Sequence, residues 1–354
     1  MYMWYNYFVY ELPFGGDKML DFLFDIFLKA SGFWLILICI LCIVGGMVLL
    51  IKGADFFVGS ASTLAKKLGV SSLVIGLTVV SIGTSLPEAS VSISSAIKGS
   101  NGLSIGNVVG SNIFNILVVL GCSCIFAPII VDKGLKKRDL PILIGTGLLL
   151  LIFTVWFNKT GNYDILRFEA IILLVLFIGY IVLTILTTPK KEETEEEKPK
   201  MKTWLCLIII VVSGFAIACG GEFVTFGAKE LAIKMGADEI LVGLTIVAVG
   251  TSLPELVTSI MAAKKKENEI AVGNAVGSSI FNILFILGAA ATISPYYNVN
   301  PDVIIDIIIM LVTFIVTTLL VIFCKNGIGR KTGIIFVILY VAYLTYIILR
   351  NYCF

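Results

Sequence analysis

The sequence contains no histidine and few charged residues. Only 14% of its 354 residues are Asp, Glu, Lys or Arg, whereas soluble domains carry about 25%. A soluble globular domain is therefore excluded. Without histidine, the chain lacks the commonest transition-metal ligand and the usual proton carrier near neutral pH. It also lacks an HExxH motif, so an intramembrane enzyme is disfavoured.

Cysteine occurs eight times, but its placement does not indicate a redox or metal site. Most cysteines lie inside apolar runs, and Cys39 and Cys42 form a C-x-x-C pair in the middle of one. In such surroundings cysteine usually behaves as a small apolar residue. We interpret the pair as helix packing and expect no cofactor.

Long apolar runs dominate the chain. Apolar residues make up 58% of it, and the mean hydropathy is +1.03. A helix needs about 20 such residues to cross a hydrocarbon core about 30 Å thick. The sequence therefore predicts an all-α integral membrane protein with ten spans. They are expected near residues 33–52, 70–97, 103–127, 139–157, 168–188, 203–228, 238–262, 270–293, 303–324 and 332–349.

Lysine and arginine are concentrated in alternate loops. If the N-terminus lies outside, 18 of the 26 basic residues fall on the cytoplasmic side and 8 lie outside. Short loops rich in Lys and Arg stay in the cytoplasm. Both termini are therefore expected outside.

Two segments beyond the spans have a distinctive composition. In the extension 1–32, Asp21, Asp25 and Lys29 recur every four residues among apolar ones. This spacing indicates an amphipathic helix on the membrane surface, unless the segment is a weakly ordered tail or the start codon lies further downstream. The mixed-charge stretch 189–202 indicates a solvated cytoplasmic linker. It has no EF-hand spacing for calcium.

The chain contains an internal duplication. Sliding it by 167 residues aligns 69–121 with 236–288 without a gap, and 28 of the 53 paired positions are identical. Asp55 and Glu222 also fall into register, and both are expected near the membrane boundary. The shared blocks are GTSLPE, at 83–88 and 250–255, and GNxVGSxIFNIL, at 106–117 and 273–284.

Each half of the chain, 33–188 and 203–354, holds five expected spans. Because five is odd, the second half must enter the membrane from the opposite side. Inverted repeats in transporters place the substrate site at mid-membrane, where the repeats meet. The first and sixth spans each precede a repeat and contain paired glycines, Gly45-Gly46 and Gly220-Gly221. These spans are candidates for an element that slides during alternating access.

Each GTSLPE block places a glutamate inside an apolar span. A charge at mid-bilayer costs about 2.5–3.5 kcal/mol on insertion scales, so Glu88 and Glu255 are interpreted as functional and as facing the interior. The proline before each glutamate removes a backbone donor and displaces the carbonyl four residues earlier. The oxygens expected to become available are those of Gly83 and Gly250 and of their neighbours Ser81, Thr84, Ala248 and Thr251.

Further oxygen donors surround the glutamates. They are Ser85, Ser111 and Asn115 in one repeat and Ser252, Ser278 and Asn282 in the other, with the hydroxyls of Thr84 and Thr251. Any one of these alone would more often serve helix packing. The glycines of the second block, at 106, 110, 273 and 277, allow helices to approach closely. Hard oxygen ligands suit Ca²⁺ or Na⁺ rather than Zn²⁺ or copper.

The two blocks resemble the α-repeats of the sodium/calcium exchanger branch of the cation/calcium exchanger superfamily, and the resemblance covers the chain from about residue 35 onward. It implies two inverted five-helix halves and four mid-membrane ion sites, one for calcium and the rest for sodium. It also implies that Glu88 and Glu255 serve both ions, with Thr84 and Thr251 beside them. The residues it implies for the sodium sites are Ser85, Ser111, Ser252, Ser278, Asn115 and the carbonyls of Ser81 and Ala248.

Two features depart from parts of that family. Some relatives, including archaeal and potassium-dependent exchangers, carry Asp where this chain has Asn282. Asparagine keeps an oxygen ligand but cannot ionise, which makes potassium coupling doubtful. The linker 189–202 has no room for the large calcium-sensing domain that some members carry there, so regulation by such a domain is not expected.

The sequence therefore predicts an antiporter in which Na⁺ and Ca²⁺ compete for two glutamates. Ca²⁺ would leave those charges neutral, and the three Na⁺ implied by the family would leave +1, so exchange would move net charge. Alternatives are a proton/calcium antiporter, exchange of another divalent ion such as Mg²⁺, and a cation channel. The expected partners are the two ions and the lipid bilayer, without nucleic acid or an obligatory protein partner. The absence of a long regulatory loop favours a prokaryotic plasma membrane.

Overall fold

The computed structural model describes residues 33–128, 134–156, 163–187, 201–236, 246, 248–323 and 327–353. Its first half contains α3 (Phe33–Leu68), α4 (Ser72–Ile75), η1 (Gly76–Val80), α5 (Ser81–Thr84), α6 (Leu86–Ile97), α7 (Asn101–Phe114), η2 (Asn115–Leu120), α8 (Gly121–Phe126), η3 (Leu135–Asp139), α9 (Leu140–Trp156), β1 (Tyr163–Ile165) and α10 (Arg167–Thr187). Its second half contains α11 (Thr203–Lys234), α13 (Ala248–Thr251), α14 (Leu253–Lys264), α15 (Asn268–Phe281), η6 (Asn282–Leu287), α16 (Gly288–Ile293), β2 (Tyr296–Val299), α17 (Pro301–Phe323) and α18 (Arg330–Cys353). The η segments are π-helical turns.

Most expected spans correspond to a described helix. Eight helices in the described part are long and apolar enough to cross a membrane, or nine when the bent pair Ser72–Thr84 and Leu86–Ile97 is one span. The expected seventh span, 238–262, begins at residues outside this description, and its later part is α13 and α14. The expected surface helix and most of the linker also lie outside the described residues.

The first and sixth helices are longer than expected. The helix α3 continues to Leu68 and α11 to Lys234, where the sequence predicted ends at 52 and 228. Hydropathy marks where a membrane ends, but a helix continues through polar residues until the backbone is interrupted. Gly69, with φ of 63°, and Gly236, with φ of 90°, follow the two helices and adopt a conformation that ends helices.

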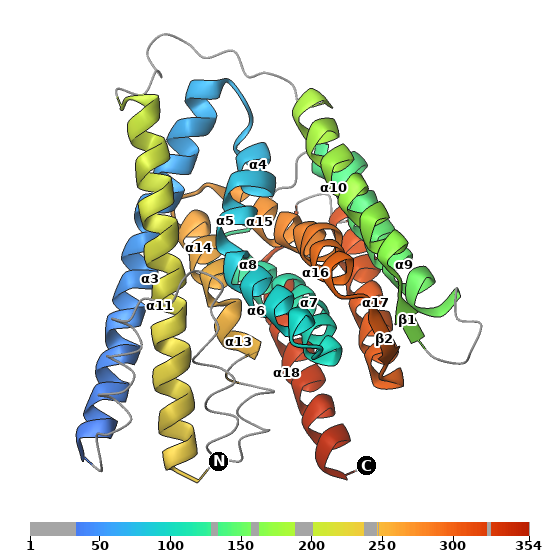
Figure 1. Ribbon diagram of the computed structural model, residues 1–354. Coiled ribbons are helices and arrows are strands. Elements are labelled where there is room, and N and C mark those ends of the chain that lie inside the picture. Colours follow the sequence, from blue (N-terminus) through green and yellow to red (C-terminus); the bar gives the residue numbers. More distant parts are fainter. Residues whose placement is uncertain are drawn as a thin grey trace.

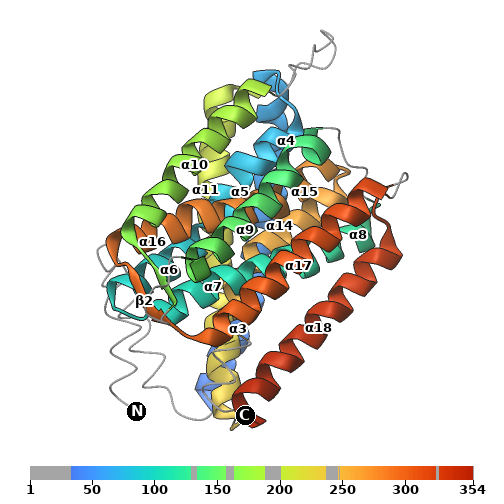
Figure 2. The ribbon, with the colours of Figure 1, turned by 90° about the vertical axis from the view of Figure 1, so that its right-hand side faces the viewer.

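The two long helices pack against each other and run in opposite directions (Figure 1). Glycines bring their backbones together. A Cβ atom built on Gly46 would lie 2.6 Å from the carbonyl oxygen of Gly220, and one on Gly227 would lie 2.6 Å from that of Cys39. The later residue of α3, Gly46, contacts the earlier residue of α11, Gly220, so the two helices are antiparallel. In Figure 2 most of the other helices lie in front of this pair.

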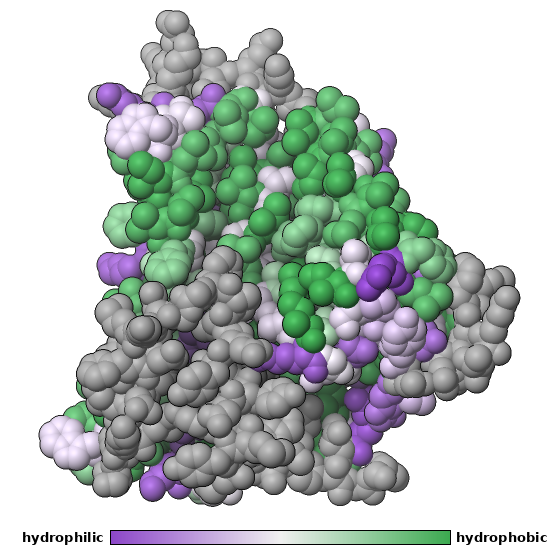
Figure 3. Space-filling model, in the orientation of Figure 1, coloured by the Kyte–Doolittle hydropathy of each residue, from purple (hydrophilic) through white to green (hydrophobic). Residues whose placement is uncertain are grey.

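The outer surface of the bundle is apolar. Trp34, Leu41 and Val48 of α3 and Val211 of α11 are exposed. Figure 3 shows hydrophobic side chains over much of the upper part of the visible face of the described helices, with hydrophilic ones at the upper left and in the lower half. A surface of this kind has lipid as its solvent, so van der Waals packing and internal hydrogen bonds hold the helices together.

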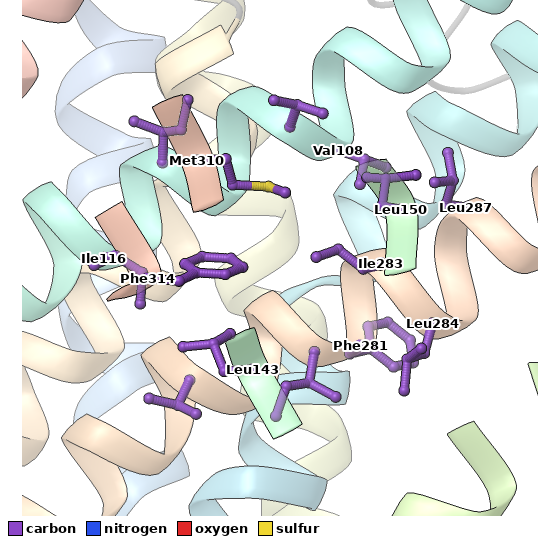
Figure 4. Packing of buried hydrophobic residues seen from close by; sticks show 14 of the residues in the cluster. Val108, Ile116, Leu143, Leu150, Phe281, Ile283, Leu284, Leu287, Met310 and Phe314 are labelled. Atoms are coloured by element: carbon purple, nitrogen blue, oxygen red, sulfur yellow. The ribbon is translucent and has the colours of Figure 1, made fainter. Parts of the chain in front are cut away.

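The main core lies on the other side of the bundle from α3 and α11. Met310 and Phe314 of α17 pack among Ile116 of η2, Leu143 of α9 and Ile283 of η6 (Figure 4), and all five side chains are fully buried. The core thus joins elements of both halves around the second blocks of the two repeats.

The duplication recurs in the backbone. The loop after α6 turns at Gly99, with φ of 75°, and the loop after α14 turns at the equivalent Lys266, with φ of 64°. Two residues further on, Asn101 donates to the carbonyl of Pro295 at 3.4 Å, and the equivalent Asn268 donates to the carbonyl of Pro128 at 3.3 Å. Contacts made on one side of the bundle are therefore repeated on the other by equivalent residues.

The expectation of an all-α chain missed one small sheet. Strands β1 and β2 pair antiparallel, with Tyr163 opposite Val299 and Ile165 opposite Tyr296. The strands contain only three and four residues, too few for a period of two to be recognised in the sequence. The sheet joins a connection in the first half to one in the second.

Candidate ion-binding site

Each GTSLPE block interrupts its helix at a serine. Ser85, with φ of −85° and ψ of 9°, separates α5 from α6, and Ser252, with φ of −93° and ψ of 6°, separates α13 from α14. In the first half, the helices on either side of the break differ in direction by 50°. The prolines stand at the start of the following helices, where a missing N–H group is tolerated.

These breaks place both glutamates in a first helical turn. Glu88 lies in the first turn of α6 and Glu255 in that of α14, and both are fully buried. The unpaired N–H groups at a helix N-terminus carry partial positive charge, which favours a carboxylate there. The local backbone thus offsets part of the cost of burying each charge.

The two repeats exchange hydrogen bonds across their interface. The Ser85 hydroxyl donates to Glu255 Oε1 at 2.7 Å, and the Ser252 hydroxyl lies 2.9 Å from Glu88 Oε1, to which it donates. Ser252 is also 3.1 Å from the Ser111 hydroxyl. Each glutamate is therefore bound by the helix break of the opposite half.

Several other polar atoms of the expected ligands make no hydrogen bonds to the described residues. They are Glu88 Oε2, Glu255 Oε2 and the side-chain amides of Asn115 and Asn282, all buried. Both asparagines are the first residue of a π-helical turn, η2 or η6. Such turns occur often at functional sites because they interrupt the regular pairing of the helix backbone.

The other expected ligands lie in the same elements. The Ser81 carbonyl accepts the N–H of Ser85 at 3.1 Å and the Ser278 hydroxyl at 3.4 Å. This carbonyl is therefore not released by the break as the sequence predicted, because the N–H of Ser85, the residue at the break, still bonds to it. Ala248 and Thr251 begin and end α13.

Glycine packing brings the halves close beside the site. A Cβ on Gly273 would lie 2.9 Å from the Gly76 Cα, and one on Gly277 would lie 2.7 Å from the Leu77 Cα. The close approach expected of these two glycines is therefore present. For Gly106, the equivalent partner segment falls within residues that the structure does not describe.

Two asparagines beside the glutamates were missed in the sequence. Asn274 Nδ2 donates to the Glu255 carbonyl at 3.3 Å and to the Ser259 hydroxyl at 2.9 Å. Asn107 makes the same contacts to Glu88, at 3.3 Å, and to Ser92, at 2.8 Å. Their identity in both repeats was a usable signal, but only the fold shows that they reach the glutamate turns.

The donor set is composed of oxygen atoms. Within the described part of the chain, no three His, Cys, Asp or Glu side chains come together as a metal cluster. The two glutamates are instead accompanied by serine, threonine and asparagine. Carboxylate, hydroxyl, carbonyl and amide oxygens are ligands for hard cations such as Ca²⁺, and soft metals prefer sulfur or nitrogen.

Comparison with known proteins agrees with this chemistry. A family model described as sodium/calcium exchanger protein matches residues 38–186 and 205–349. The chain belongs to the sodium/calcium exchanger family. Sodium/calcium exchanger MaX1 of Methanosarcina acetivorans is 32% identical to it over 336 residues, covering 84% of this chain and 95% of that protein. The inner membrane protein YrbG of Escherichia coli is 35% identical over 265 residues, covering 71% and 78%.

The same family is represented among solved structures. The sodium-calcium exchanger NCX_Mj, soaked with 10 mM Na⁺ and no Ca²⁺, superposes with a TM-score of 0.77 at 30% identity, covering 88% of this chain and 99% of that one. The resemblance stated from the α-repeats is thus confirmed. This family member has the fold of a membrane exchanger, its class is cation/calcium antiport, and it is a transporter rather than an enzyme.

Proposed function

We propose that this family member exchanges Na⁺ for Ca²⁺ across a prokaryotic plasma membrane by alternating access. The observation that carries the proposal is the pair of buried glutamates, each bound by a serine of the opposite half and each with one further buried oxygen that accepts no hydrogen bond from the described residues. The chain would cross the membrane ten times with both termini outside, as the distribution of Lys and Arg favours.

The proposed ligands lie on both repeats. Glu88 and Glu255 would bind either ion, so Na⁺ and Ca²⁺ would compete and one would leave before the other binds. The remaining proposed ligands are Thr84, Thr251, Ser85, Ser252, Ser81, Ala248, Ser111, Ser278, Asn115 and Asn282. Hydroxyl and amide oxygens adjust to ions of different number and charge because they contribute no fixed charge.

The charge of the site determines whether exchange is electrogenic. With Asn282 neutral, the two glutamates are the fixed charges of the ligand set. One Ca²⁺ balances them, and three Na⁺ leave a net charge of +1. A three-for-one cycle would therefore move one positive charge and respond to membrane potential, which contributes about 2.3 kcal/mol per charge per 100 mV.

We propose α3 and α11 as one sliding unit, since glycines join them closely and much of their surface faces outward. Gly46→Ala would insert a Cβ atom 2.6 Å from the Gly220 carbonyl and push the helices apart. Overpacking costs about 1–3 kcal/mol, so we expect a lower melting temperature and calcium exchange about tenfold slower.

The adjacent Gly45→Ala is the matched control for this variant. A Cβ there meets no atom of the described residues within 4 Å, and alanine favours a helix more than glycine does. Its stability and exchange rate should therefore equal or exceed those of the wild type. Wild-type exchange by Gly46→Ala would refute the sliding unit.

The function is tested in liposomes loaded with sodium. Purified protein is reconstituted and diluted into sodium-free buffer, and uptake of radiolabelled calcium is measured with matched sodium and with an imposed pH gradient as controls. We expect uptake only with the outward sodium gradient. Uptake driven by the pH gradient would make protons the coupling ion. Current without any sodium gradient would indicate a channel. Uptake of magnesium in place of calcium would identify Mg²⁺ as the exchanged divalent ion.

A further inference from the structure

The inference concerns Asn274 in α15 and its repeat equivalent Asn107 in α7. The side chain of each donates hydrogen bonds to two residues one helical turn apart on the helix that carries the glutamate of its own half. Asn274 binds Glu255 and Ser259. Asn107 binds Glu88 and Ser92. Asn274 makes one contact more, because its Oδ1 atom accepts the Thr84 hydroxyl of the opposite half at 3.1 Å. Among the described residues, Asn107 makes only the two contacts in which its amide donates.

We propose that Asn274 is a positioning residue that sets Glu255 and Thr84 relative to each other across the two repeats. The proposal rests on the proposed ion exchange at these two residues. Among the described residues its counterpart Asn107 makes no cross-repeat contact, and it holds only the glutamate turn of its own half, through Glu88 and Ser92. Neither asparagine is a proposed ion ligand.

The glutamate turn requires such support because the chain is interrupted just before it. At Ser252 the helix loses its continuity with α13, so α14 could pivot about this point. A single primary amide has two N–H donors in one plane. One N–H binds the Glu255 carbonyl and the other binds the Ser259 hydroxyl one turn later. Together they restrain both the rotation of α14 about its axis and its translation along that axis relative to α15.

The same restraint orients the amide oxygen toward Thr84. With both donors engaged, the plane of the Asn274 side chain is determined, and its oxygen can point in only one direction. That direction is toward Thr84 Oγ1. Fully engaged buried amides specify one arrangement of neighbouring helices, because any other leaves a polar atom unpaired.

The contact also prepares Thr84 to bind a cation. A hydroxyl that binds a cation presents a lone pair to it and must direct its single hydrogen elsewhere. Thr84 Oγ1 lies 3.1 Å from the Val80 carbonyl in its own half and 3.1 Å from Asn274 Oδ1 in the other. A hydrogen directed to Asn274 ties the orientation of this hydroxyl to the position of Glu255.

A purely structural interpretation is that Asn274 is helix glue, as polar residues often are between membrane helices. It predicts a loss of stability with no specific link to Thr84. The positioning role predicts that removing Asn274 weakens calcium binding more than removing Asn107, and that the effects of changes at 274 and 84 are coupled. The inverted repeat thus supplies its own control.

The experiment measures calcium affinity by titration calorimetry on the purified full chain, without transport. We expect Asn274→Ala to weaken calcium binding about tenfold and Asn107→Ala about threefold, because the first variant loses three hydrogen bonds and the second loses two. In a double-mutant cycle, the loss of calcium affinity in the variant with both Thr84→Val and Asn274→Ala should be about fivefold smaller than the product of the two separate losses. For Thr84→Val and Asn107→Ala, the combined loss of calcium affinity should equal the product of the two separate losses.

Conservative changes complete the test. Thr84→Ser keeps the hydroxyl and should restore the affinity lost in Thr84→Val. If Asn274→Ala does not fold, Asn274→Leu, which preserves the volume, replaces it in the cycle. Multiplicative effects of Thr84 and Asn274 would overturn the positioning role while leaving the ion site in place. A folded wild-type chain that binds no calcium would instead overturn the proposed function.

Discussion

Replacing Glu88 or Glu255 with glutamine is expected to abolish sodium-driven calcium uptake while the chain still folds. Glutamine keeps the shape of the side chain and can still accept a serine hydroxyl, as Oε1 of both glutamates does. It loses the charge that balances a divalent ion. Removing one partner of a buried charge pair costs about 2–5 kcal/mol, so uptake should fall about a hundredfold or more.

A third buried glutamate provides the control for these variants. Glu169 is also fully buried, but it lies in the first turn of α10, where its Oε2 accepts the Leu166 N–H at 2.7 Å. A glutamine there keeps an acceptor for that bond, so Glu169→Gln should exchange at close to the wild-type rate. Normal calcium uptake by Glu88→Gln or Glu255→Gln in the liposome assay would refute the proposed site.

Replacing Asn282 with aspartate is expected to make exchange depend on pH. The amide is buried and makes no hydrogen bond to the described residues, and aspartate is nearly isosteric with it. In the proposed ligand set, a third carboxylate competes with Glu88 and Glu255 for cations and favours taking up a proton. At low pH the protonated aspartate is neutral, like asparagine, and exchange should approach that of the wild type.

At high pH the same variant should differ from the wild type. The ionised aspartate adds a negative charge, which should tighten the binding of both ions and slow their release. We expect the ratio of variant to wild-type exchange to change about tenfold between pH 5 and pH 9. The measurement is calcium uptake at both pH values under one sodium gradient. A constant ratio would show that position 282 does not contact the transported ions.

Much of the fold was predictable because a bilayer restricts what a chain can do. Backbone groups in hydrocarbon must pair within their own segment, so apolar runs of sufficient length become helices. The ends of α3 and α11 were not predictable in this way. Beyond the hydrocarbon the chain is free of that restriction, and the glycines at 69 and 236 decide where these helices stop.

The candidate site was predictable in its members but not in its pairings. The repeated GTSLPE block identifies both glutamates, because a carboxylate in an apolar span is costly and two in register are not accidental. That Ser85 binds Glu255 and Ser252 binds Glu88 follows only from how the halves face each other. A contact between residues 170 positions apart leaves no local pattern in the chain.

By itself the sequence determined the membrane class, the duplication and the chemical type of the ligands. These depend on hydropathy, identity and charge, which are properties of residues and short segments. Only the tertiary structure decided which serine binds which glutamate, where the long helices touch, and that Asn274 reaches Thr84 of the other half. Those facts depend on the relative placement of two halves, which is set by close packing of many side chains at once.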